Sequence, residues 1–263
     1  MTWSNARAFF KRDLLTDISY KLSFILNGAD ILLTVVAFYF ASVWFGPKAP
    51  HGYASFPFIL IGIAVNGYMT TSLLCFSQGI NGRTHGSTLK AALVSHIDAG
   101  SYIALSSLYP LFRAGIDAAI YLAAGLFFGL SISGINVPVV LVVFIASILA
   151  FTGLGVMSAA FSVYFKRGDP IQWTVALLSW TLGGVFFPRE VLPSFLQRVG
   201  SLLPVTSAAE AMRAAMLRGS SLPEIAGLVG SLLLFATVAL PLGFAAFFYA
   251  VRRAKVNGSL DHQ

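Results

Sequence analysis

The stretch from Val137 to Phe165 reads VPVVLVVFIASILAFTGLGVMSAAFSVYF and contains no charged residue. A helix needs about 20 apolar residues to cross the ~30 Å hydrocarbon core of a bilayer, so this stretch is long enough to span it at a tilt. The whole chain has the same character, since 57% of its 263 residues are hydrophobic and 10% are charged. A water-soluble domain carries about 25% charged residues. The sequence therefore predicts an all-α protein embedded in a membrane.

Further apolar stretches flank this one and leave no room for a sizeable soluble domain. We predict a single domain over residues 1–263 with six transmembrane helices, at 24–45, 56–77, 109–131, 137–165, 171–187 and 226–251. The fifth stretch is short, and Gly183–Gly184 followed by Pro188 breaks it early. A membrane tolerates such a break only where protein or water satisfies the backbone. This segment is therefore expected to be re-entrant or interfacial.

The distribution of Lys and Arg predicts the orientation. Twelve lie in segments on the side of both termini and five lie on the other side. Because positive residues concentrate in cytoplasmic segments, both termini are predicted to be cytoplasmic. The net charge of +7 is then explained by topology, and no nucleic-acid partner is expected.

The segment before the first span, residues 1–23, predicts an amphipathic helix at the cytoplasmic interface. Phe10, Leu14 and Ile18 recur every four residues, whereas Asp13 and Asp17 fall on the opposite side. This spacing places an apolar stripe along one face. A role as a simple membrane-surface anchor remains an alternative.

Two loops are longer than a connection requires. The cytoplasmic loop at 80–107 contains a predicted short helix and indicates a docking role. The segment at 188–223 predicts two short amphipathic helices at the outer leaflet, because Pro193 and Pro204 suit first helical turns and Gly219 suits a helix stop.

Together these features resemble the membrane subunit of an ABC type-2 exporter, over nearly the whole chain. The resemblance is most specific before the last span, in Gly184-Val-Phe-Phe-Pro188, Leu192-Pro193, Leu203-Pro204 and Glu210-x-x-Arg213 leading to Gly219. Thr88-Leu89 with Leu93-Val94-Ser95 is similar to the coupling segment of that family. The coupling segment departs from the family pattern, with Ser87 in place of glycine, Lys90 in place of an acid and His96 in place of proline.

The resemblance implies a transport subunit and not an enzyme. It implies a second permease subunit, with a homodimer expected, and two ABC ATPase subunits that carry ATP and Mg. No G-x-x-x-x-G-K-[ST] motif occurs in the sequence, so this chain is expected to bind no cofactor itself. The implied cargo is an amphiphile (a lipid-linked glycan, a lipid or a hydrophobic drug) exported through a bacterial inner membrane. The compact outer loops favour the polysaccharide, Nod-factor or drug exporters.

The resemblance also implies roles for particular residues. Those expected to contact the ATPase are Arg83, Ser87, Thr88, Leu89, Lys90 and Leu93. Those expected to form the re-entrant exit gate are Phe187, Pro188, Pro193, Pro204, Glu210 and Arg213.

The fifth span is the most polar and aromatic of the six. Trp173 with Trp180, and Thr174 with Thr181, are seven residues apart and share one stripe. Rings and hydroxyls together suit an amphiphilic or glycan cargo, by stacking and hydrogen bonding. We therefore predict a substrate pathway formed by Gln172, Trp173, Thr174, Trp180, Thr181 and, on the first span, Tyr39. Packing between helices is the alternative explanation for this stripe.

Charged residues inside predicted spans are few. Asp30 is expected to pair, to protonate or to lie near an interface, because a centred charge costs about 2.5–3.5 kcal/mol on insertion scales. Arg113 and Asp117 are four residues apart and are predicted to pair. Cys75 is the single cysteine, and His85 and His96 lack ligand companions, so no metal site is expected. An ion-coupled secondary transporter and, less favoured, a membrane lipid or glycan transferase remain alternatives.

Overall fold

The computed structural model describes residues 3–45, 54–81, 99–130, 134–165 and 170–256. The regular elements in these ranges are helical. The long helices are α1 (Trp3–Ser19), α2 (Lys21–Phe45), α3 (Ser55–Asn81), α5 (Ala99–Phe127), α6 (Val137–Phe165) and α10 (Ala226–Val256). Between α6 and α10 lie α7 (Pro170–Leu182), the 3₁₀ turn η2 (Arg189–Val191), α8 (Ser194–Ser201) and α9 (Pro204–Leu217).

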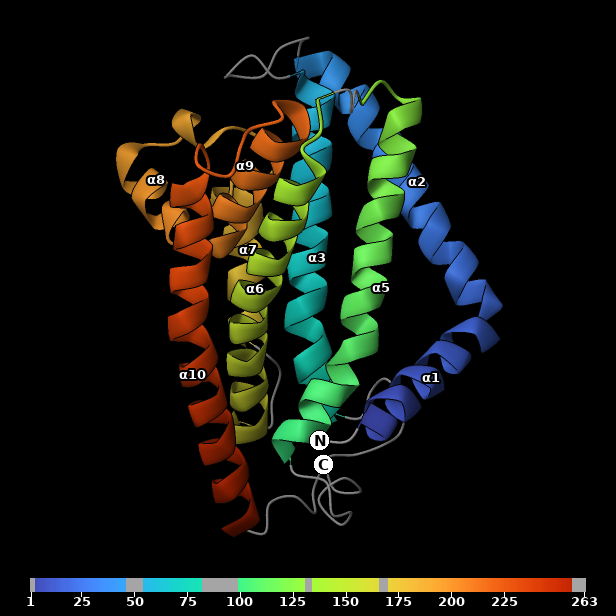
Figure 1. Ribbon diagram of the computed structural model, residues 1–263, viewed down its shortest axis with the longest axis vertical. Coiled ribbons are helices and arrows are strands. Elements are labelled where there is room, and N and C mark those ends of the chain that lie inside the picture. Colours follow the sequence, from blue (N-terminus) through green and yellow to red (C-terminus); the bar gives the residue numbers. More distant parts are fainter. Residues whose placement is uncertain (1–2, 46–53, 82–98, 131–133, 166–169, 257–263) are drawn as a thin grey trace.

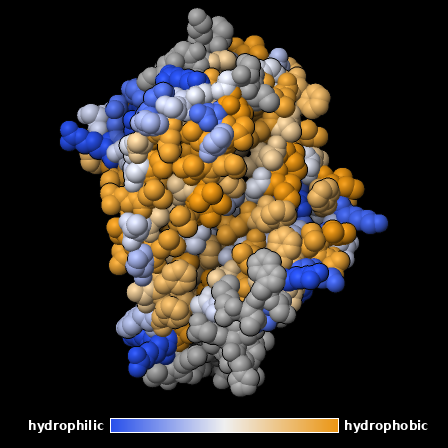
Figure 2. Space-filling view, in the orientation of Figure 1, coloured by the Kyte–Doolittle hydropathy of each residue, from blue (hydrophilic) through white to orange (hydrophobic). Residues whose placement is uncertain are grey.

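The helices form a bundle in which α3 lies in the middle, packed against α5 on one side and α6 on the other (Figure 1). Helix α10 runs along α6, whereas α2 leans away from the bundle. The lower end of the bundle in Figure 1 carries α1, and the upper end carries α8 and α9. Figure 2 shows hydrophobic side chains across the middle of this face and hydrophilic ones gathered mainly towards its ends, as a membrane protein requires.

Five helices in the described ranges are long and apolar enough to cross a membrane: α2, α3, α5, α6 and α10. The predicted fifth span at 171–187 is different, because α7 ends at Leu182. Its 13 residues extend about 20 Å at 1.5 Å per residue, which is less than the hydrocarbon thickness. The residues after it, Gly183 to Val185, are buried and non-helical. The sequence signal for an early break thus marks a real helix end, but the predicted boundary at 187 was too late.

The predicted third span began too late. It was placed at 109–131, whereas α5 begins at Ala99 and contains Pro110 in its interior. Residues 99–107, assigned to the cytoplasmic loop, are therefore helical. Long membrane helices accommodate an internal proline because neighbouring helices re-satisfy the backbone. The six predicted ATPase-contact residues, Arg83 to Leu93, lie outside the described residues.

Helices α6 and α10 approach closely through small residues. A Cβ added to Gly153 would lie 2.7 Å from the Cβ of Ala239 and 3.0 Å from the α10 backbone, and one added to Gly243 would lie 2.9 Å from the Gly153 carbonyl oxygen. Association of helices within a bilayer depends on such close packing, since lipid is as apolar as the side chains.

Gly153→Ala should therefore destabilise the bundle, by about 1–3 kcal/mol as expected for overpacking. Gly230→Ala on α10 is the matched control, because nothing lies within 4 Å of its added Cβ and alanine favours a helix. Thermal unfolding of both variants in detergent measures the difference. Equal melting temperatures of the two variants would show that α6 and α10 can move apart at Gly153, to make room for the added methyl group, without loss of stability.

Helix α1 packs on the lower half of α5 with both of its faces. Phe10 stacks edge-on against Tyr109 and Phe112, with ring centroids 5.5 and 5.3 Å apart. Asp17, on the predicted polar side, accepts hydrogen bonds from Tyr109 and Arg113. On the predicted apolar stripe, Leu14 is half-buried, but Ile18 is 58% exposed. The two faces of α1 are thus less sharply divided than the four-residue spacing indicated.

Candidate functional site

A polar cavity of about 210 Å³ lies at the α8–α9 end of the bundle. The turn after α7, helix α9 and the starts of α3 and α10 enclose it. Its lining includes three of the predicted gate residues, Pro188, Glu210 and Arg213, together with Phe58, Gly184, Arg189, Glu190, Ala214, Arg218 and Leu228. We call this the outer cavity.

Arg213 holds the wall of the outer cavity together. Its side chain is 2% exposed. Its Nε donates to the carbonyl of Phe58 and its Nη2 to that of Val185, each at 3.0 Å, and its guanidinium lies 3.5 Å from the Phe58 ring centroid. A Cβ at Gly62 would lie 2.4 Å from Nη2, so a glycine is required there. A single side chain thus joins α9 to α3 and to the turn that follows α7.

The other charged residues of the outer cavity form a more exposed group. Glu210 accepts from Arg189 at 3.1 Å through Oε1, and both side chains are about one-third exposed. Glu210 and Arg213 are three residues apart, a spacing that puts them on one face of a helix, but this spacing does not indicate that the arginine is buried. Exposed pairs such as Arg189–Glu210 contribute about 0–1 kcal/mol, so this pair can open at little cost.

The turn between α7 and α9 depends on glycines and on one hydroxyl. Gly184 has φ +65°, a left-handed conformation that glycine adopts without strain. A Cβ at Gly200 would lie 2.6 Å from the Leu182 carbonyl oxygen, so α8 approaches the end of α7 closely. Thr206 donates to the Gly200 carbonyl at 2.7 Å. Together these contacts position the turn beneath the outer cavity.

The remaining predicted gate residues do not line this cavity. Pro193 precedes α8 and is exposed, whereas Pro204 occupies the first turn of α9 and is buried. Phe187 is 36% exposed and is not among the residues that line the cavity. Of the six predicted residues, three therefore meet in one place.

The predicted pathway residues of α7 form an open surface. Trp173 is 75% exposed and Trp180 is 36% exposed, with Thr174 and Thr181 also exposed and Gln172 half-buried. The Thr181 hydroxyl donates to the Leu177 carbonyl at 2.8 Å within its own helix. The heptad stripe is thus turned away from the bundle of this chain, and its role as a substrate pathway stays a prediction.

An aromatic stack that the sequence did not reveal joins α7 to α2. Phe186 stacks on Trp180 with ring centroids 4.9 Å apart and on Phe38 with centroids 5.2 Å apart. Tyr39, the predicted member from α2, instead packs against Phe56 and Phe128. The sequence signal for Phe186 was its place in the Gly-Val-Phe-Phe-Pro segment, but helical spacing could not show which face of α2 would meet it.

The predicted pair within α5 is confirmed and belongs to a larger network. Arg113 Nε lies 3.2 Å from Asp117 Oδ1, and its Nη1 also pairs with Asp17 of α1. Asn27 of α2 donates to Asp117 at 3.1 Å. One guanidinium thus serves two carboxylates and connects α1, α2 and α5. Asp17 was not predicted to take part, because it is remote from Arg113 in sequence.

These features define an integral membrane protein with long apolar helices, a short interrupted helix and a polar cavity at one end. Residues 7–217 match the family model described as ABC-2 type transporter. The match covers most of the chain, so the chain belongs to this family. It is a membrane permease, the transport component of an ABC transporter system. No curated protein matches the chain.

Proposed function

We propose that this permease exports an amphiphilic cargo, such as a lipid-linked glycan, a lipid or a hydrophobic drug, out of the cytoplasm. Two permease subunits form the pathway between them, and two separate ABC ATPase subunits bind ATP and Mg below it. Membership of the ABC-2 family supports the ATP-driven system. It disfavours the ion-coupled and transferase alternatives.

The observation that carries the cargo proposal is the outward surface of α7. Trp173 and Trp180 offer ring faces, and Thr174 offers a hydroxyl on the same exposed side. Aromatic rings with hydrogen-bonding groups suit molecules that have both apolar and polar parts. A pathway for a small inorganic ion would need neither ring.

The outer cavity supports a gate at the exit. The turn after α7 is held on one side by Arg213 and on the other by the Trp180–Phe186–Phe38 stack. A movement of α7 relative to α2 must therefore break the stack, while the Arg213 bonds keep the turn attached to α3 and α9. We propose that ATP-driven closure of the ATPase pair pushes the coupling segment and α1, and that α2 and α7 then separate to open the pathway.

The proposal is tested by reconstituting the permease with an ABC ATPase that co-purifies with it. A fluorescent phospholipid and a prenyl-linked sugar serve as cargo in proteoliposomes. ATP-dependent translocation is expected, with Trp180→Ala lowering its rate about two- to tenfold, the equivalent of losing an aromatic stack. Trp44→Ala is the matched control, because Trp44 is 95% exposed at the end of α2 and should have little effect.

Two results would contradict the proposal. The first is translocation that requires an ion gradient and proceeds without any ATPase. The second is a permease that never associates with an ATPase when solubilised.

A further inference from the structure

Asp30 stands out among the charged residues of the described spans. It lies within α2, and its side chain is exposed. No described residue donates a hydrogen bond to it or forms an ion pair with it. Asp117, by contrast, is held by Arg113 and Asn27. An ionisable residue inside a span is costly, and it usually marks a functional site whose partner must be found.

Asp30 lines a polar cavity of about 150 Å³ between α2, α3 and α5. Asn27, Thr71, Asp117 and Tyr121 add polar groups to its wall. Because Arg113 already serves both Asp17 and Asp117, the charge balance around the cavity is negative. A ligand that enters it from the bilayer or the cytoplasm would therefore be favoured if it carried a positive charge.

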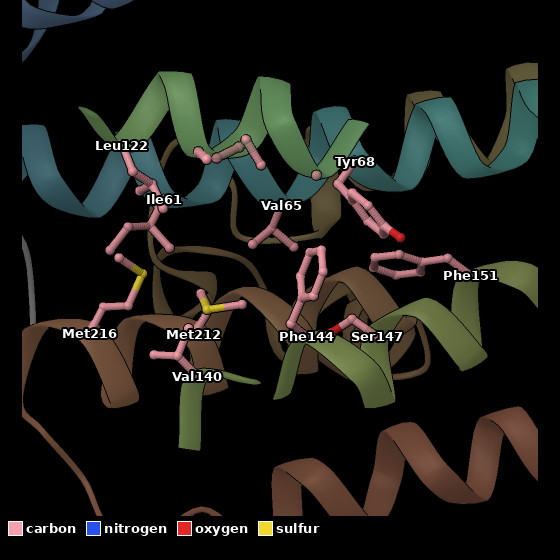
Figure 3. A pocket seen from close by; sticks show the side chains of 14 residues that line it. Ile61, Val65, Tyr68, Leu122, Val140, Phe144, Ser147, Phe151, Met212 and Met216 are labelled. Atoms are coloured by element: carbon pink, nitrogen blue, oxygen red, sulfur yellow. The ribbon is translucent and has the colours of Figure 1, made fainter. Parts of the chain in front are cut away.

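A second cavity of opposite character adjoins the first. It has a volume of about 140 Å³ and lies between α3, α5, α6 and α9 (Figure 3). Apolar side chains supply nearly all of its wall, among them Val65, Phe144 and Met212. The two cavities share Ala64, Tyr68 and Ala118 in their linings. Only small side chains and one tyrosine thus lie between them.

Tyr68 provides an independent sign of a ligand. Its side chain is 4% exposed, and its hydroxyl has no hydrogen-bond partner among the described residues. Figure 3 shows this hydroxyl at the end of the apolar cavity beside Phe151. A buried hydroxyl without a partner costs free energy that a bound molecule can recover.

We propose that the two cavities form one binding site for an amphiphilic amine. The ammonium group lies in the polar cavity, where it pairs with Asp30 and donates a second N–H to the hydroxyl oxygen of Tyr68, which lines both cavities. The apolar body then enters the cavity lined by Phe144 and Met212. Each cavity has about the volume that holds a benzene-sized group. The inference rests on the proposed function, since it specifies the charge of an amphiphilic cargo.

The test measures binding to the permease alone, in nanodiscs, with empty nanodiscs as the reference. The probe is 4-phenylbutylammonium, and 4-phenylbutanol is its uncharged counterpart. We expect the ammonium compound to bind at least about tenfold more tightly, because a charge pair in a partly dry cavity is stronger than in water. Asp30→Asn should remove this preference, whereas Asp30→Glu should retain it.

Two further variants test the apolar cavity and supply a control. Ala119→Phe, in the wall of the apolar cavity alone, should weaken both compounds. Glu224→Gln removes a carboxylate between α9 and α10 that lines neither cavity, and it should change neither affinity. Thermal unfolding shows that each variant is folded.

Equal affinity for the two compounds, or an unchanged preference in Asp30→Asn, would overturn the inference. Because the measurement uses no ATPase, such a result would leave ATP-driven export intact. If the reconstituted permease shows no ATP-driven transport but still prefers the ammonium compound, the result would instead count against the proposed function.

Discussion

Replacing Arg213 with leucine is expected to abolish transport and to lower the melting temperature of the permease. The substitution keeps an apolar stem but leaves the carbonyls of Phe58 and Val185 without their donors. Each buried group left unsatisfied costs about 1–3 kcal/mol, so the loss of both bonds should cost about 2–6 kcal/mol. The turn after α7 would then detach from α3 and α9.

Arg198→Leu is the control for this change. Arg198 lies on the neighbouring helix α8 and is exposed, so its loss should leave both stability and transport close to those of the parent. Arg213→Lys should show partial activity, since an ammonium can reach one carbonyl but cannot form the planar two-donor contact. A stable and fully active Arg213→Leu variant would show that the turn does not depend on this arginine.

Arg113→Met is expected to have the second large effect, by releasing α1 from α5. Arg113 is 17% exposed and neutralises both Asp17 and Asp117. Removing one partner from a mostly buried charge pair typically costs about 3–5 kcal/mol, because the remaining charges are left without compensation. Hydrogen exchange should accelerate through α1, and ATP hydrolysis by the partner should lose its dependence on cargo.

The charge explanation has its own check. A triple variant, with Asp17→Asn, Arg113→Met and Asp117→Asn, removes the carboxylates left without a partner and should recover part of the lost stability. Arg252→Met is the control, because Arg252 is exposed near the end of α10 and its loss should have no effect on stability. If the triple variant is no more stable than Arg113→Met alone, the shape of the arginine and not its charge supports α1.

Composition and hydropathy predicted the membrane class and the place of the long helices. The span at 137–165 coincides with α6, because a charge-free apolar stretch has only one stable state in a bilayer, a helix with its backbone bonds satisfied internally. The family resemblance was also present in local sequence, since the glycines and prolines between 183 and 219 act through backbone conformation at their own positions.

Tertiary structure decided which distant residues meet. Helical spacing showed that Arg113 could reach Asp117, but only the docking of α1 brought Asp17 to the same guanidinium. It showed that Glu210 and Arg213 shared a helix, but only the packing of α9 on α3 buried the arginine beneath Phe58. Local sequence determines backbone conformation and the face of a helix on which a residue lies. The partner of that face depends on how whole helices pack, and a single helix carries no record of this.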